Sequence, residues 1–186
     1  MAYSFDNIGQ IFSSTSVLNY LKSIKVGASA PTISAYLSAL ADSMIIERLQ
    51  RYDIKGKKIM QRMDKYYVSD LGIRHIEIGY RDNDIGQLLE NVVFNELLVR
   101  GYDVYVGKEG EREIDFIANK GQNRIYIQVA YLLATPDVIN REYRSLLAVK
   151  DAYPKIVLSM DKLPQGPREG VKHQYLLDFL LNGLDV

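Results

Sequence analysis

The part of the sequence that decides the fold is Glu113-Ile114-Asp115-Phe116-Ile117-Ala118, followed by Ile125-Tyr126-Ile127-Gln128-Val129-Ala130. Both runs are rich in residues that favour β-strands, and the turn residues 119–123 separate them. Because side chains alternate along a strand, we expect Ile114 and Phe116 on one face and Asp115 on the other. The same alternation places Gln128 on the face of the strand opposite to that of its neighbour Ile127. Asp115 and Gln128 are therefore predicted to lie side by side on one face of a sheet.

The residues around these two runs predict further strands and helices. Apolar residues recur at helical spacing over Ile85–Arg100, and Gly101 follows as a helix C-cap residue would. Glu90 lies at the edge of the apolar face of this helix, where a carboxylate needs a cation, a metal or a donor to meet it. The remaining predictions are strands at 103–106, 155–159 and 171–174, and helices at 137–151 and 175–182.

The first 81 residues predict helices followed by a hairpin. Helical spacing runs through residues 8–24, although a serine-rich tract can interrupt it, and a second helix begins at Pro31 and ends near Ser43. Residues 44–52 are strand-like, residues 53–58 form a turn, and residues 65–68 supply the returning strand. Helix, turn, helix and hairpin is the element order of a winged helix-turn-helix.

The predicted hairpin is basic, as expected of a wing that lies against phosphates. Its candidate nucleic-acid-binding residues are Lys55, Lys57, Lys58, Arg62 and Lys65. A solvated turn is the alternative reading, because lysine also serves to keep a hairpin soluble. The helix before the hairpin offers only Thr32, Ser34, Ser38 and Asp42 outward, none of which pairs bidentately with a base edge as Arg, Asn or Gln does.

Charge divides the chain into two halves. The whole chain has 186 residues and no formal net charge, with 23 basic and 23 acidic residues. Residues 1–81 hold 11 basic and 7 acidic residues, whereas residues 82–186 hold 12 and 16. The change falls in a polar segment at residues 79–84, so we predict one domain over 1–81 and another over 82–186.

Composition excludes several classes of protein. Cysteine is absent, which removes disulfides, thiolate zinc sites and cysteine nucleophiles, and only two histidines are present. The apolar runs are far shorter than a membrane span, and the N-terminus does not resemble an export signal. We therefore expect a cytoplasmic protein without a membrane partner. The pattern GxxxxGK[ST] is also absent, so no ATPase activity is expected of this chain.

The second half is predicted to run helix, three strands, helix and strand, with acids on the first helix and the second strand. This order resembles the restriction-endonuclease-like αβββαβ core. Nearly the whole chain also resembles the C-terminal region of a family of bacterial and archaeal AAA-type ATPases. The motifs that carry this resemblance include residues 32–37, 65–74, 89–97, 113–116 and 125–131. These resemblances imply a mixed α/β protein, in which a winged helix-turn-helix precedes a nuclease-like domain. They also imply an ATPase domain or partner protein, and DNA as a possible ligand.

The resemblance also assigns candidate catalytic positions to Glu90, Asp115 and Gln128, with Glu90 and Asp115 as weak metal ligands. Active nucleases of this fold carry Glu-x-Lys where this chain has Gln128-Val129-Ala130, and alanine cannot activate water. The nearby cations that could compensate are Arg141, Arg144 and Lys150. The sequence therefore favours a non-catalytic DNA- or protein-recognition module that requires no cofactor.

Two alternatives remain open. One is a metal-dependent DNA endonuclease with an altered active site, the only reading that calls for Mg²⁺. The other is a pure protein-interaction module. Whether the chain is an enzyme is left undecided by its sequence.

Overall fold

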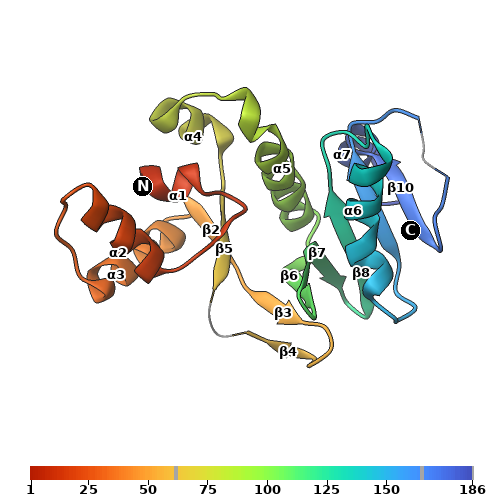
Figure 1. Cartoon of the computed structure of the whole chain (residues 1–186), viewed down its shortest axis with the longest axis horizontal. Coiled ribbons are helices and arrows are strands. Elements are labelled where there is room, and N and C mark those ends of the chain that lie inside the picture. Colours follow the sequence, from red (N-terminus) through yellow and green to blue (C-terminus); the bar gives the residue numbers. More distant parts are fainter. Residues whose placement is uncertain (61–62, 164–165, 186) are drawn as a thin grey trace.

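The computed structural model describes residues 1–60, 63–163 and 166–185. The described part is a mixed α/β structure, as the sequence predicts, and it contains seven α-helices and two sheets. The smaller sheet has the strand order β1-β5-β2, and the larger has the order β10-β9-β8-β7-β6-β3-β4 (Figure 1).

The first helices pack around the smaller sheet. α1 (Ala2–Asp6), β1 (Ile11–Phe12), α2 (Ser14–Ser23) and α3 (Ala30–Asp42) precede β2 (Ile46–Leu49). α2 begins where it does because the Ser13 side chain accepts a hydrogen bond from the Ser16 N–H, which caps the helix. The serine tract thus starts a helix instead of interrupting one, and the predicted helix over residues 8–24 is wrong before Ser14. Phe5, Ile8 and Phe12 bury their side chains in the core of this half.

The predicted hairpin is divided between the two sheets. Its base consists of β2 and β5 (Asp64–Val68), which pair antiparallel in the smaller sheet. Its tip consists of β3 (Arg51–Asp53) and β4 (Lys58–Ile59), which pair with each other. β3 also runs parallel to β6 and so extends the larger sheet. The larger sheet therefore contains strands from both sides of the predicted boundary at residue 81.

A helix that the sequence patterns do not predict follows the hairpin. α4 (Leu71–Ile78) is capped by Asp70, whose carboxylate accepts from the Gly72 N–H, and a short 3₁₀ helix, η1 (Asp82–Asp84), follows it. Arg74 of α4 is completely buried, donates its Nε to the Phe5 carbonyl at 2.9 Å and pairs with Asp84. This arginine joins α1, α4 and η1.

Helices cover both faces of the larger sheet. Its long strands are β6 (Asp103–Glu109), β7 (Arg112–Lys120), β8 (Asn123–Val129), β9 (Lys155–Ser159) and β10 (Val171–Tyr175), so all five predicted strands are confirmed. α5 (Ile85–Val99) and α7 (Leu176–Asn182) pack on one face, and α6 (Pro136–Ala148) packs on the other (Figure 1).

A β-bulge changes the alternation of side chains in β7. Tyr105 of β6 pairs with Ile117, but Gly107 pairs with Ile114, so β7 carries one extra residue between these pairs. Phe116 packs on the α5 face, whereas Ile114 and Ile117 pack on the α6 face. Ile114 and Phe116 therefore do not share a face, contrary to prediction. Gly107 suits this close approach, because a Cβ there would lie 3.0 Å from that of Ile114.

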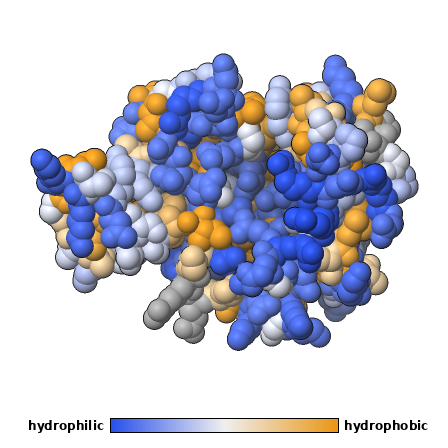
Figure 2. All heavy atoms as spheres, viewed as in Figure 1, coloured by the Kyte–Doolittle hydropathy of each residue, from blue (hydrophilic) through white to orange (hydrophobic). Residues whose placement is uncertain are grey.

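Hydrophilic residues cover most of the face shown in Figure 2, with small apolar patches between them. Across the described residues, none of the helices has both the length and the apolar character that crossing a bilayer requires.

Candidate functional site

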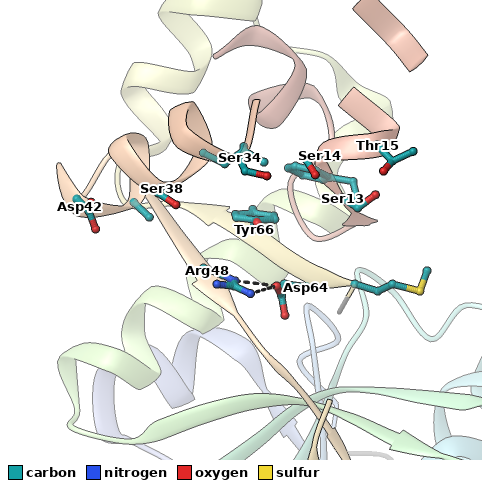
Figure 3. Close-up of a pocket in the computed structure, with 13 residues that line it drawn as sticks. Ser13, Ser14, Thr15, Ser34, Ser38, Asp42, Arg48, Asp64 and Tyr66 are labelled. Carbon is teal, nitrogen blue, oxygen red and sulfur yellow. Dashed lines mark hydrogen bonds and ion pairs between the residues drawn. The ribbon is translucent and has the colours of Figure 1, made fainter. Parts of the chain in front are cut away.

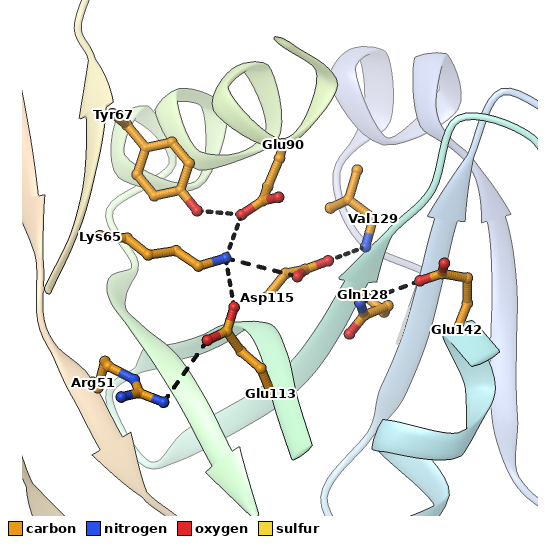
Figure 4. Close-up of polar contacts among 9 residues, drawn as sticks. All are labelled: Arg51, Lys65, Tyr67, Glu90, Glu113, Asp115, Gln128, Val129 and Glu142. Carbon is orange, nitrogen blue, oxygen red and sulfur yellow. Dashed lines mark hydrogen bonds and ion pairs between the residues drawn. The ribbon is translucent and has the colours of Figure 1, made fainter. Parts of the chain in front are cut away.

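Three carboxylates meet one lysine between the two sheets (Figure 4). The Nζ atom of Lys65, on β5, lies 2.8 Å from Glu90 Oε1 on α5 and 2.9 Å from Glu113 Oε1 on β7. The same Nζ lies 4.0 Å from Asp115 Oδ1. We call Lys65, Glu90, Glu113 and Asp115 the lysine–carboxylate cluster.

Strand alternation on β5 explains why a lysine is buried here. Tyr66 and Val68 point into the core of the first half, so Lys65 and Tyr67 point the other way, toward α5 and the larger sheet. The Lys65 side chain is only 4% exposed. Burial by itself would lower the pKa of Lys65, but the charges of Glu90, Asp115 and Glu113 together raise it above its usual value. Lys65 is therefore charged in the folded protein.

Side chains of α5 and β5 hold the helix against the strand. Asn91 accepts from the Val68 N–H at 2.9 Å and donates to the Val68 carbonyl at 2.8 Å. The Tyr67 hydroxyl donates to Glu90 Oε1, the same oxygen that receives Lys65. The Tyr67 ring stacks on Phe94, 4.5 Å between centroids. These contacts fix Glu90 beside Lys65.

Asp115 and Glu113 are the two members of the cluster that lie on the larger sheet. Asp115 Oδ2 accepts from the Val129 N–H at 2.8 Å, and Asp115 Oδ1 faces Lys65. Burial, followed by the nearby charge of Glu90, raises the pKa of Asp115 well above its usual value, although Lys65 opposes this. Glu113 is one third exposed and also faces Arg51, 3.9 Å away. The cluster is thus open to solvent chiefly on its Glu113 side.

The structure brings together two of the three predicted catalytic positions. Glu90 and Asp115 both meet Lys65, but Gln128 donates its amide to Glu142 of α6 at 3.2 Å (Figure 4). Gln128 follows Ile127, which packs on the α5 face, so alternation directs Gln128 toward α6. The bulge in β7 turns Asp115 toward α5 instead. The predicted side-by-side placement of Asp115 and Gln128 is therefore wrong.

The cation at this site is not one that the sequence proposes. Arg141 pairs with Glu142 at 2.7 Å, Lys150 donates to the Leu147 carbonyl, and Arg144 lies exposed on α6. Lys65 supplies the ammonium instead, from a strand 50 residues before Asp115 in the chain. The expectation that a compensating cation would come from Arg141, Arg144 or Lys150 is therefore wrong. Glu113, Tyr67 and Lys65 are the members of the site that sequence reasoning missed.

The predicted nucleic-acid-binding residues divide into three groups. Lys55, Lys57 and Lys58 are exposed at the tip of the hairpin. Arg62 lies outside the described residues. Lys65 is buried in the lysine–carboxylate cluster, so its assignment to the phosphate-contacting surface is wrong. The reason is its place on β5, whose face bearing Lys65 is covered by α5.

Carboxylate oxygens are the ligands that Mg²⁺ prefers, so the chemistry of Glu90 and Asp115 suits this ion. Their geometry suits it less, because the ammonium of Lys65 already lies among the oxygens. In the portion that the structure describes, no three His, Asp or Glu side chains are grouped so that they could hold a metal ion. Binding of Mg²⁺ here would require Lys65 to move.

The chain is similar to known proteins, but none of the matching proteins has a known activity. Residues 2–84 match a domain of unknown function, DUF8612, and this match ends where α5 begins. An uncharacterised protein of Haemophilus influenzae is 38% identical over 176 residues, which cover 95% of this chain and 43% of that protein. An uncharacterised protein of Methanocaldococcus jannaschii is 33% identical over 121 residues, which cover 63% of this chain and 26% of that protein.

The chain therefore spans less than half the length of either relative. No solved structure matches it. Both relatives are longer than this chain, and both are described as uncharacterised proteins.

Proposed function

We propose that this chain is a non-catalytic nucleic-acid-recognition module, composed of a winged helix and a nuclease-like core, that serves an ATPase domain or partner. The order α2, α3 and a hairpin supports the winged helix. The order α5, β6, β7, β8, α6, β9 supports the nuclease-like core. The association with an ATPase rests on the resemblance of the sequence alone.

The observation that carries the recognition function is the exposed lysine tip of the hairpin. Lys55, Lys57 and Lys58 all lie on or beside a turn of four residues, and none of them forms an ion pair with a described residue. Three unpaired ammonium groups at one tip suit the phosphate backbone of a nucleic acid, because they release the counterions condensed on it. A neutral ligand has no condensed counterions to release and so gains no such free energy.

The lysine–carboxylate cluster supports a non-catalytic role. A nuclease needs ionised carboxylates that are free to take a metal. Here the ammonium of Lys65 already contacts the carboxylates of Glu90 and Glu113 and lies 4.0 Å from Asp115 Oδ1. These charges fasten β5 of the first half to β7 of the second.

A binding assay tests the recognition function. Replacing Lys55, Lys57 and Lys58 by alanine should weaken the binding of duplex DNA. It should also reduce the slope of log K against log salt by about 0.9 for each phosphate that the variant no longer neutralises. The matched control replaces Lys22, Lys150 and Lys162, three exposed lysines away from the hairpin. Equal effects of the two triple variants, or no binding by the unchanged protein, would contradict the proposal, and the latter would favour a protein-interaction module.

A metal-dependent nuclease is the second candidate, and the position of Lys65 favours it. In active members of this fold, the lysine of Glu-x-Lys places an ammonium group beside the strand Asp. In this chain, Lys65 of β5 places an ammonium group 4.0 Å from Asp115 Oδ1. Glu90 and Asp115 would hold the metal, which acidifies a water molecule when bound. Lys65 would orient that water after leaving the carboxylates.

Incubation with supercoiled plasmid and Mg²⁺ or Mn²⁺ separates the two functions. The recognition proposal predicts binding without cleavage. Cleavage that Asp115→Asn abolishes, and that Lys162→Met at an exposed position away from the hairpin retains, would establish the nuclease and refute the non-catalytic role.

A further inference from the structure

Tyrosine rings gather on the α6 side of the larger sheet, beyond the strands that this helix covers. α6 packs over β7, β8, β9 and β10, and β6 and β3 lie to one side of it (Figure 1). Tyr52 of β3 and Tyr105 of β6 pack at the edge of the core on this side, with 6.1 Å between their ring centroids. Both rings are half-buried. Tyr153 lies just before β9 and is 43% exposed.

Arg124 of β8 connects these rings. Its guanidinium carbon lies 4.9 Å from the centroid of the Tyr52 ring and 5.6 Å from that of the Tyr153 ring. Its Nε donates to Asn119 Oδ1 at 3.0 Å, and it forms no ion pair with a described residue. The charge of Arg124 is therefore available to an anionic ligand. We call Tyr52, Tyr105, Arg124 and Tyr153 the tyrosine–arginine face.

Tyr153 also lines a hollow of about 410 Å³. The charged residues of this hollow are two acids, Asp151 and Glu169, and two bases, Lys155 and Lys172, so it has no formal net charge. Asp151 is already paired, because it lies 3.7 Å from Lys155. A hollow without net charge suits an uncharged flat ring, which can stack on an exposed tyrosine.

The cavity between the first helices and the base of the hairpin offers no comparable surface. It measures about 630 Å³, and its two aromatic rings, Tyr66 and Phe12, stack on each other with 4.6 Å between centroids (Figure 3). Its arginine, Arg48, is paired with Asp64 at 2.6 Å. An exposed ring beside an arginine without an acidic partner is therefore a feature of the tyrosine–arginine face and not of this cavity.

The tyrosine–arginine face adjoins the lysine tip of the hairpin. Tyr52 lies on β3, and the turn that carries Lys55 and Lys57 directly follows this strand. Proteins that bind single strands combine basic groups along the phosphate backbone with aromatic rings on which the bases stack. The bases of a duplex stack on one another and leave no face free for a protein ring. Aromatic rings beside a basic tip therefore favour a single strand.

We propose that the tyrosine–arginine face binds the bases of a single-stranded nucleic acid. One base stacks on Tyr153, Tyr52 and Tyr105 supply apolar surface to the next, and Arg124 contacts the phosphate between them. The lysine tip holds phosphates further along the strand. This inference rests on the proposed function and adds the class of nucleic acid that the module takes.

Fluorescence anisotropy of the full chain tests this inference with two labelled strands. One is an oligothymidylate of about 20 nucleotides, and the other is an abasic strand of the same length, which keeps the phosphates and lacks the bases. We expect the oligothymidylate to bind at least about tenfold more tightly. Tyr153→Ala should weaken its binding at least about fivefold and leave the abasic strand within about twofold. Tyr153→Phe keeps the ring and should retain the binding.

Tyr131→Ala is the matched control, because Tyr131 is 47% exposed and follows the opposite end of β8. Equal binding of the two strands, or equal effects of Tyr153→Ala and Tyr131→Ala, would overturn the inference. The proposed function would still stand in that case if alanine at Lys55, Lys57 and Lys58 weakened both strands. No binding of either strand or of a duplex would remove both. An oligouridylate of the same length identifies the preferred sugar by its affinity relative to the oligothymidylate.

Discussion

Replacing Lys65 by methionine is the sharpest test of the lysine–carboxylate cluster. Methionine preserves most of the length of the aliphatic stem and removes the ammonium group. Glu90, Glu113 and Asp115 then face one another with no cation at contact distance. We expect the variant to fold with much reduced stability at pH 7.

The expected loss follows from the burial of the cluster. Removing one partner of a buried ion pair costs about 3–5 kcal/mol, because it leaves an uncompensated charge. Solvent screens the one-third exposed Glu113, so most of this loss arises from Glu90 and Asp115. The free energy of unfolding of a domain of this kind is about 5–15 kcal/mol, so the variant should retain part of its stability.

Urea unfolding followed by far-ultraviolet circular dichroism measures this loss. The chain has 14 tyrosines and no tryptophan, so tyrosine fluorescence is the second probe of the transition. Lys58→Met on the exposed tip is the control, with a change within about 0.5 kcal/mol. Adding Glu90→Gln to Lys65→Met should recover part of the loss, because it removes an unpaired charge.

The reasoning would be refuted by a loss below about 1 kcal/mol for Lys65→Met, since that is the contribution of an exposed ion pair. Equal losses for Lys65→Met and Lys58→Met would refute it as well. In the lysine-free variant, stability should rise as the pH falls toward 4, because protonation then relieves the repulsion among the three carboxylates.

Two other predictions concern charged groups on either side of the cluster. The raised pKa of Asp115 makes the folded protein bind more protons than the unfolded chain between pH ~4 and that raised value, so stability falls as the pH rises across this window. Asp115→Asn should therefore become more stable relative to the unchanged protein as the pH rises from 4 to 7, and a pH series of urea unfolding that shows no such trend would contradict the assignment. Arg74→Met should cost about 3–5 kcal/mol in the same assay, because it leaves the buried Phe5 carbonyl without this donor and Asp84 with only the more exposed Arg81. Arg112→Met on an exposed strand end should change little.

Local patterns in the sequence predict most of the second half correctly. Alternation over residues 103–129 gives three strands, and the apolar spacing after Ile85 gives α5 with Glu90 at its buried edge. These elements are predictable because each depends on side chains a few residues apart. The Asp70 cap at α4 is a local signal of the same kind, and a reading that searched for caps would have found that helix.

The site itself depends on contacts that sequence spacing does not encode. Asp115 reaches the cluster because a bulge adds one residue to β7, which reverses the expected alternation. Lys65 reaches it because β5 lies across α5, and nothing near Lys65 in the sequence distinguishes it from the exposed lysines of the hairpin tip. The parallel pairing of β3 with β6 is likewise non-local. The positions of Asp115, Lys65 and β3 are therefore all set by tertiary packing.

The shared hairpin limits how this polypeptide can be cut or fused. A break at residue 81 would leave β3 in the fragment 1–81 without its partner β6. In the fragment 82–186, β6 would become an exposed edge strand prone to pair with other chains. Neither piece is a sound starting point for expression on its own. Protein engineers who wish to transplant the lysine tip should carry the larger sheet along with it.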